Sequence, residues 1–175
     1  GFRLKKGGES PREAQRNGSF NGVLELCLGA PDPNRIVRED DPPQLPVTGS
    51  DTITVRVVEK GQTLVERRLR FVSNGALQLM DSTWSAERMA AHVGERFYVC
   101  VEDPDRDASD EQDKLTVRAT SLAGTNDVEL VETLPHSGVF TGTYPSKKYG
   151  DQVIFRYNDE RVLPGTQLPR TLCVT

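Results

Sequence analysis

Short runs of alternating apolar and polar residues recur along most of the chain. Between residues 96 and 102, Phe97, Val99 and Val101 alternate with more polar neighbours. This period of two is typical of a β-strand that buries one face. Comparable apolar runs, separated by glycine and proline, predict further strands at residues 20–28, 51–58, 69–72, 77–79, 115–119, 128–131, 140–144, 152–157 and 172–174. Residues 82–93 are expected to form a loop with a short helix.

The number and spacing of these strands predict the fold class. Seven of them fall within residues 76–175, where no long helical period is present. Such spacing favours an all-β protein, an immunoglobulin-like Greek-key β-sandwich. The chain has a formal net charge of −4, and residues 76–175 carry ten basic and sixteen acidic side chains. This balance argues against a nucleic-acid surface and favours cations as partners.

The two parts of the chain are related by an internal repeat. Residues 13–22 resemble 132–142, residues 49–57 resemble 150–157, and residues 69–72 correspond to 171–174. We therefore predict two domains: residues 1–75 form the C-terminal half of a repeat, with a leader and a long proline-rich loop, and residues 76–175 form a complete repeat. Half a sandwich cannot bury its own apolar face. Its missing strands would come from residues before residue 1, from another copy or partner by strand addition, or from packing on the complete domain.

An acidic loop follows the strand at residues 96–102. Asp103, Asp105 and Asp107 occupy alternate positions, so an extended loop would project three carboxylates to one side. Calcium takes six to eight oxygen ligands from loops of this kind. The loop has Ala108 and Lys114 where an EF-hand has glycine and glutamate, so it is not an EF-hand, and the alternative is a solvated acidic turn. Two further carboxylates, Asp110 and Asp113, are close enough in sequence to add oxygens.

The three cysteines have no short spacing that would indicate a zinc site. Cys100 and Cys173 each lie on the polar register of a predicted strand, so they can form a disulfide in an oxidising compartment, which leaves Cys27 unpaired. The alternative is three free thiols.

Several stretches of the second repeat resemble one family. They read ALQLM at 76–80, VGERFYVCVEDPDRD at 93–107, LTVRA at 115–119, VELVET at 128–133, SGVFTG at 137–142 and GDQVIFRYND at 150–159. The chain resembles the immunoglobulin-like tandem repeats of very large bacterial and archaeal surface proteins, S-layer-like and adhesin-like chains among them. In such repeats the strand before the acidic loop usually ends in V-x-D-x-D-x-N, and Asp107 fills the last position here. The resemblance implies a cation site at Asp103, Asp105, Asp107 and Asp159. The first half repeat has Glu59 in place of Asp159 and an inserted loop at residues 29–48.

The function implied is structural. We expect a secreted or cell-surface, non-enzymatic segment of an array, filament or adhesin stalk, stiffened by calcium and assembled with other copies of itself or with neighbouring surface-protein domains. No catalytic or nucleotide-binding motif supports an enzyme, and neither nucleic-acid binding nor membrane insertion is expected. The alternative is a secreted carbohydrate- or protein-binding module, in which exposed aromatic residues such as Trp84 would contact the ligand.

Overall fold

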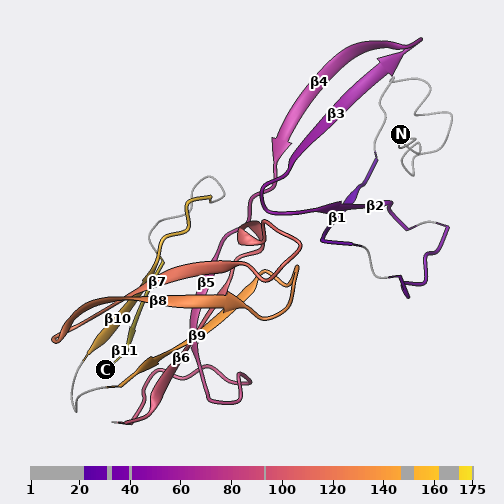
Figure 1. Cartoon of the computed structure of the whole chain (residues 1–175). Helices are drawn as coiled ribbons and strands as arrows, with labels where there is room; N and C mark the ends of the chain where they lie inside the picture. Colours follow the sequence, from indigo (N-terminus) through magenta and orange to yellow (C-terminus); the bar gives the residue numbers. More distant parts are fainter. Residues whose placement is uncertain are drawn as a thin grey trace. The chain divides into compact units, whose positions relative to one another are not determined.

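A computed structural model of the chain describes residues 22–30, 33–39, 41–92, 94–146 and 152–161, and the backbone of residues 170–174 (Figure 1). Over these residues the protein is all-β, as the sequence predicts, with one short 3₁₀ turn at Pro104–Arg106. None of the described segments is a helix long and apolar enough to cross a membrane. By contacts the chain divides between Val47 and Thr48. The domain boundary that we predict at residue 75 rests on the internal repeat and stays a prediction.

The first unit contains one small parallel pair of strands. β1 (Glu25–Leu28) pairs with β2 (Gln44–Val47). Glu25 anchors the start of the pair, because its carboxylate accepts bonds from Arg35 at 2.9 Å and from Gln44 at 3.2 Å. β2 lies in the long proline-rich segment, where the sequence pattern predicts a loop. Pro46 makes β2 hard to predict from the sequence, because proline is tolerated in a strand only at an edge or end.

The second unit begins with an antiparallel ribbon. β3 (Thr52–Glu59) pairs with β4 (Gln62–Arg70), and the Lys60–Gly61 turn between them has positive φ at both residues. β4 ends at Arg70 and begins earlier than the predicted strand at 69–72, because its first half, in which Leu64 and Val65 are adjacent, has no apolar alternation.

The remaining strands form the main body of the fold. They are β5 (Ala76–Met80), β6 (Arg96–Glu102), β7 (Lys114–Ser121), β8 (Gly124–Glu132), β9 (Val139–Pro145), β10 (Val153–Tyr157) and β11 (Arg170–Val174). Their hydrogen-bonded order is β11-β10-β7-β8-β9-β6-β5. Only two residue pairs link β8 to β9. The ladder therefore folds there into two layers, β11-β10-β7-β8 and β9-β6-β5 (Figure 1).

The core lies between these layers and is built by the period of two. Phe97, Val99 and Val101 of β6 are buried, as the alternation predicts, and their neighbours are not. Rings from both layers meet edge to face, with Phe155 5.6 Å from Phe97 and 5.7 Å from Tyr144 between ring centroids. The other core residues are Leu79, Leu115, Val117, Ala119, Val128, Leu130, Phe140, Val153 and Tyr157.

Two local predictions have different outcomes. Residues 81–92 form turns and an isolated bridge between Met80 and Glu87, so the expected short helix is not found in that segment. Cys100 is a free, half-buried thiol, as is Cys27. The side chain of Cys173 lies outside the described residues, so its pairing with Cys100 stays a prediction.

Candidate cation site

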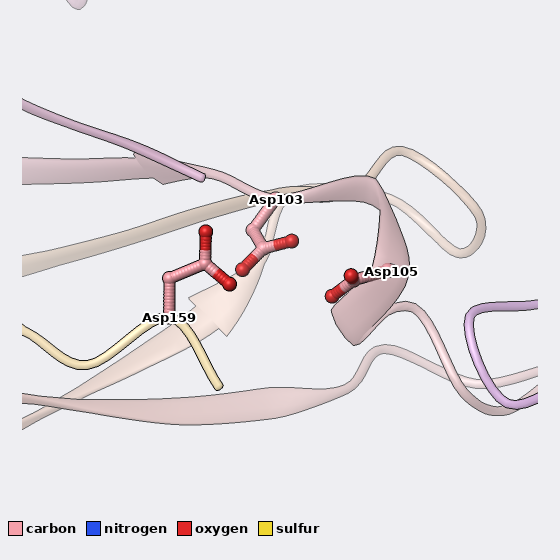
Figure 2. Close-up of side chains that lie close together, drawn as sticks. All are labelled: Asp103, Asp105 and Asp159. Carbon is pink, nitrogen blue, oxygen red and sulfur yellow. The ribbon is translucent and has the colours of Figure 1, made fainter. Parts of the chain in front are cut away.

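Three of the predicted carboxylates meet at one end of the core. β6 ends at Glu102, and Asp103 follows it directly. The 3₁₀ turn then carries Asp105 back beneath the strand, and Asp159 lies two residues beyond β10. Figure 2 shows the three side chains pointing toward a common space. One oxygen from each carboxylate lies within 4.8 Å of the others, and all three residues are buried.

Hydrogen bonds from neighbouring segments hold two of these carboxylates. Asp103 accepts bonds from the Tyr157 hydroxyl and from Ser73 Oγ, the latter at 3.2 Å. Asp159 accepts the backbone N–H of Gly75 at 2.7 Å and that of Arg161 at 3.1 Å. The segment before β5 is therefore hydrogen-bonded to both of these carboxylates, to Asp103 through Ser73 and to Asp159 through Gly75.

Asp105 is held by one oxygen only. Its Oδ2 accepts the Ser73 backbone N–H at 3.2 Å. Its Oδ1 has no hydrogen-bond partner, although the residue is only 1% exposed. Among the described residues this is the buried side-chain oxygen that lacks a partner. A buried oxygen without a hydrogen-bond partner costs free energy, so we expect the Asp105 carboxylate to bind a proton or a cation.

The charges around Asp105 explain its proton affinity. Burial, followed by the neighbouring Asp103 and Asp159, raises the pKa of the Asp105 carboxyl from 3.8 to about 7. Burial and the bond to Asp103 also raise the pKa of the Tyr157 hydroxyl. The guanidinium group of Arg161 donates to the backbone oxygens of Gly49 and Asp105, and not to the carboxylates.

This donor set suits a hard divalent cation. All three groups are carboxylates, and calcium prefers oxygen ligands at 2.3–2.6 Å. Two oxygens bound to such an ion lie at most about 5 Å apart, and one oxygen of each carboxylate lies within 4.8 Å of the others. The residues therefore fit calcium. They would supply three of its ligands, and bound calcium would cancel the repulsion among the buried charges.

The fourth predicted ligand, Asp107, lies in a different group. Asp107 and Glu132 are buried and Asp113 is half-buried, and one oxygen of each lies within 4.8 Å of the others. The Asp107 carboxylate contacts His136 Nδ1 at 3.2 Å, and burial raises its pKa despite this contact. Asp110, the other nearby carboxylate, has a side chain that is 99% exposed.

Hydrogen bonds account for the rest of this second group. Asp113 accepts the backbone N–H groups of Ala108 and Ser109 at 2.7 and 2.9 Å. Glu132 accepts those of Gly138 and Asp113 at 2.8 and 3.1 Å. These bonds shape the loop after Asp107 and the turn before β9, which is a structural role.

Gly49 allows the segment before β3 to contact the acidic loop. The Gly49 N–H donates to the backbone oxygen of Asp107. A Cβ at Gly49 would lie 2.0 Å from the backbone oxygen of Asp105, so no larger residue fits. Together with residues 73–75, this contact joins both ends of the β3–β4 ribbon to the acidic loop.

The acidic pattern predicts Asp103 and Asp105, and the family resemblance implies Asp159, but neither indicates the residues that support them. Ser73, Gly75 and Tyr157 complete the site from positions far away in the sequence. Of these three residues, only Gly75 gives a signal in the sequence, namely the absence of a side chain. A Cβ at this position would lie 3.1 Å from Asp103 Oδ2 and 3.2 Å from Asp159 Oδ2.

Comparison with other proteins places the chain in no family. No protein-family profile matches it, and no curated protein matches it at a significant level.

Proposed function

We propose that the chain is a non-enzymatic structural segment of an extracellular assembly, such as a surface array, filament or adhesin stalk, and that calcium stiffens it. The observation that carries this proposal is the partnerless Asp105 Oδ1 between two other buried carboxylates. A cation there would join the ends of β6 and β10 to the segment leaving the β3–β4 ribbon, because Ser73 and Gly75 are bonded to the same carboxylates. The site would then fix a junction between successive parts of the chain.

The strand order supports an immunoglobulin-like Greek-key topology. β7, β8 and β9 are consecutive hairpin strands, and β10 lies beside β7. This is the spatial order 4-1-2-3 that defines a Greek key. β6 lies beside β9, which gives the same motif in the reverse direction. The two layers that result have the strand composition of an immunoglobulin-type sandwich.

The ribbon supports the tandem repeat. Residues 49–57 resemble 150–157 in sequence, and they form β3 where the later stretch forms β10. β3 pairs antiparallel with the strand that follows it, as β10 pairs with β11. The first repeat is therefore a ribbon that requires the remainder of a sandwich, which other copies or neighbouring surface-protein domains would provide.

Electron microscopy of the purified chain in calcium-containing buffer and in chelator tests this function. We expect regular filaments or sheets with calcium, and fewer or more flexible ones in chelator. Asp105→Asn should reproduce the chelator result in calcium, whereas Asp110→Asn, which changes an exposed carboxylate, should not. Uniform small particles in both buffers would contradict the structural function.

A secreted binding module is the second candidate, and one observation favours it. Trp84 is 37% exposed beside an apolar hollow of about 270 Å³ that Thr133 and Thr141 also line. Exposed tryptophan next to hydroxyl groups suits the face of a sugar ring. A binding module should stay monomeric at high concentration, and its melting temperature should rise with the correct glycan but not with an unrelated one.

A further inference from the structure

The β3–β4 ribbon presents an apolar face to solvent. The strand register sets Ile53 opposite Leu69 and Val57 opposite Val65, and Val55 lies between them on the same side, opposite Arg67. We call the five apolar residues the apolar face of the ribbon, and Arg67 lies among them. Val55, Val57, Val65 and Leu69 are between 42% and 53% exposed. The opposite face is polar, with Glu66 bonded to Arg56 at 2.7 Å and to Arg68 at 3.3 Å.

The residues of this face in β3 correspond to residues that are buried in the second repeat. The repeat matches Ile53, Val55 and Val57 with Val153, Phe155 and Tyr157 of β10, which are at most 3% exposed. In the described part of the chain, β3 and β4 pair only with each other. An isolated two-stranded ribbon is marginally stable in water, and contiguous exposed apolar faces mark interaction sites.

An apolar surface that could bind the apolar face of the ribbon lies on the sandwich. Met80, Cys100 and Val139 line the apolar hollow of about 270 Å³ beside Trp84. Cys100 has the opposite register to the core residues Val99 and Val101, so the hollow lies on the outer side of the β9-β6-β5 layer. We call it the Trp84 hollow.

The tryptophan in this hollow is held firmly in place. Its ring meets that of Tyr98 edge to face, with centroids 5.4 Å apart. The preceding turn is fixed by Asp81, whose Oδ1 accepts the backbone N–H groups of Thr83 and Ser85 at 3.1 and 3.0 Å. The hollow is therefore shaped before any partner arrives, which lowers the entropic cost of docking.

The ribbon and residues 76–175 have opposite net charges. Residues 52–70 of the ribbon carry five basic and two acidic side chains. Residues 76–175, which contain the hollow, carry ten basic and sixteen acidic side chains. Opposite potentials steer association between the ribbon of one molecule and the sandwich of another, whereas two ribbons would repel each other.

The geometry points to a head-to-tail contact in which the apolar face of the ribbon of one copy docks on the Trp84 hollow of a second copy. This inference rests on the proposed assembly function and names the contact that carries it. Because the two surfaces differ, the contact is heterologous and leaves one of each free at the ends of a pair. Repetition then produces an open chain of molecules, as an array or filament requires.

Sedimentation velocity in calcium-containing buffer, over a range of concentrations, tests the contact. Val57→Lys places a charge in the ribbon face, and Thr141→Arg places one in the hollow. Each variant alone should lose self-association by at least about tenfold in affinity, a change of about 1.4 kcal/mol. The matched controls are Thr54→Lys on the polar face of the ribbon and Thr116→Arg on the exposed side of β7, and both should associate like the wild type.

Mixing the two variants makes the test specific. Val57→Lys keeps an intact hollow, and Thr141→Arg keeps an intact ribbon, so an equimolar mixture should form a one-to-one dimer and nothing longer. Dimer formation also shows that both variants fold.

Other outcomes overturn the contact in distinguishable ways. If Thr141→Arg assembles like the wild type and Val57→Lys does not, the ribbon binds another surface. If both assemble like the wild type, the contact is wrong while the assembly function stands. If the wild type stays monomeric at all concentrations, both proposals fail.

Discussion

Asp105 shows what a single buried carboxylate demands of its surroundings. Its Oδ2 accepts a hydrogen bond from a backbone N–H, whereas its Oδ1 has no hydrogen-bond partner. Asp103 and Asp159 add negative charge beside it. Burial of an uncompensated charge is so costly that the group either binds a proton or a cation. The proton and the cation compete for the same oxygen, so pH and calcium are linked at this residue.

The first prediction concerns stability against pH in chelator. The folded-state pKa of Asp105 is raised from 3.8 to about 7, so the folded state retains a proton that the unfolded state releases. Its contribution to stability is fully present below about pH 4 and is lost as the pH rises through about 7, by at most about 1.4 kcal/mol per pH unit. Urea unfolding between pH 4 and 8 measures this slope. Asp105→Asn should flatten it, and an unchanged slope in that variant would assign it to other groups.

The second prediction concerns Glu132, which is 1% exposed. Glu132→Ala would leave the N–H groups of Gly138 and Asp113 without their acceptor, at a cost of roughly 1–3 kcal/mol for each buried group. We expect a loss of about 2–5 kcal/mol in the free energy of unfolding, measured by urea denaturation. Glu132→Gln keeps one acceptor oxygen and should lose clearly less. Equal losses in the two variants would mean that packing, rather than hydrogen bonding, determines the effect.

Residue patterns revealed half of the candidate site. The alternation of Asp103 and Asp105 predicts a cation loop because calcium takes its oxygen ligands from acidic loops of this kind. The same pattern wrongly suggests that Asp107 joins them, and the 3₁₀ turn explains the difference, because it breaks the extended geometry that alternation assumes. Partners such as Ser73 depend on which segments the fold brings together, and no local pattern contains that information.

At the scale of elements, periodicity predicts the strands that bury one face and also the exposed β3, but it does not predict the first half of β4. β6 and β10 have apolar residues at every second position because the core imposes them. The first half of β4 has no such pattern, since neither of its faces is covered within the described residues. Within the exposed ribbon, the sequence was therefore informative for β3 but not for the first half of β4.

The third prediction follows from this contrast and uses amide hydrogen exchange. In dilute protein the amides of β3 and β4 should exchange through local opening, at least about a hundredfold faster than those of β6, which open only with the whole sandwich. The amides of β10, the corresponding strand in the second repeat, serve as the control and should be protected. If the assembly contact forms, raising the protein concentration should slow exchange in the ribbon alone. Protection of the ribbon equal to that of β6 in a monomer would contradict its being uncovered.

At the scale of the whole molecule, the candidate cation site connects segments that no single sheet connects. Residues 73–75 and Gly49 bring both ends of the ribbon to the acidic loop, and Asp159 brings the end of β10. Without a cation, this meeting point concentrates like charges and opposes folding. With calcium bound it becomes a crosslink, so the ion should stabilise the molecule as a whole.

The fourth prediction measures that stabilisation by heat. A ligand at a hundred times its dissociation constant adds about 2.7 kcal/mol, which for a chain of this size raises the melting temperature by roughly 5–10 °C. Trp84 is the single tryptophan of the chain, so its fluorescence reports unfolding of the sandwich directly. Magnesium should stabilise less, because it demands a tighter octahedral set of ligands. Asp105→Asn should remove the calcium shift, whereas Asp110→Asn should retain it. A shift that persists in Asp105→Asn would place the ion elsewhere, and identical melting in calcium and chelator would remove calcium from the proposed function.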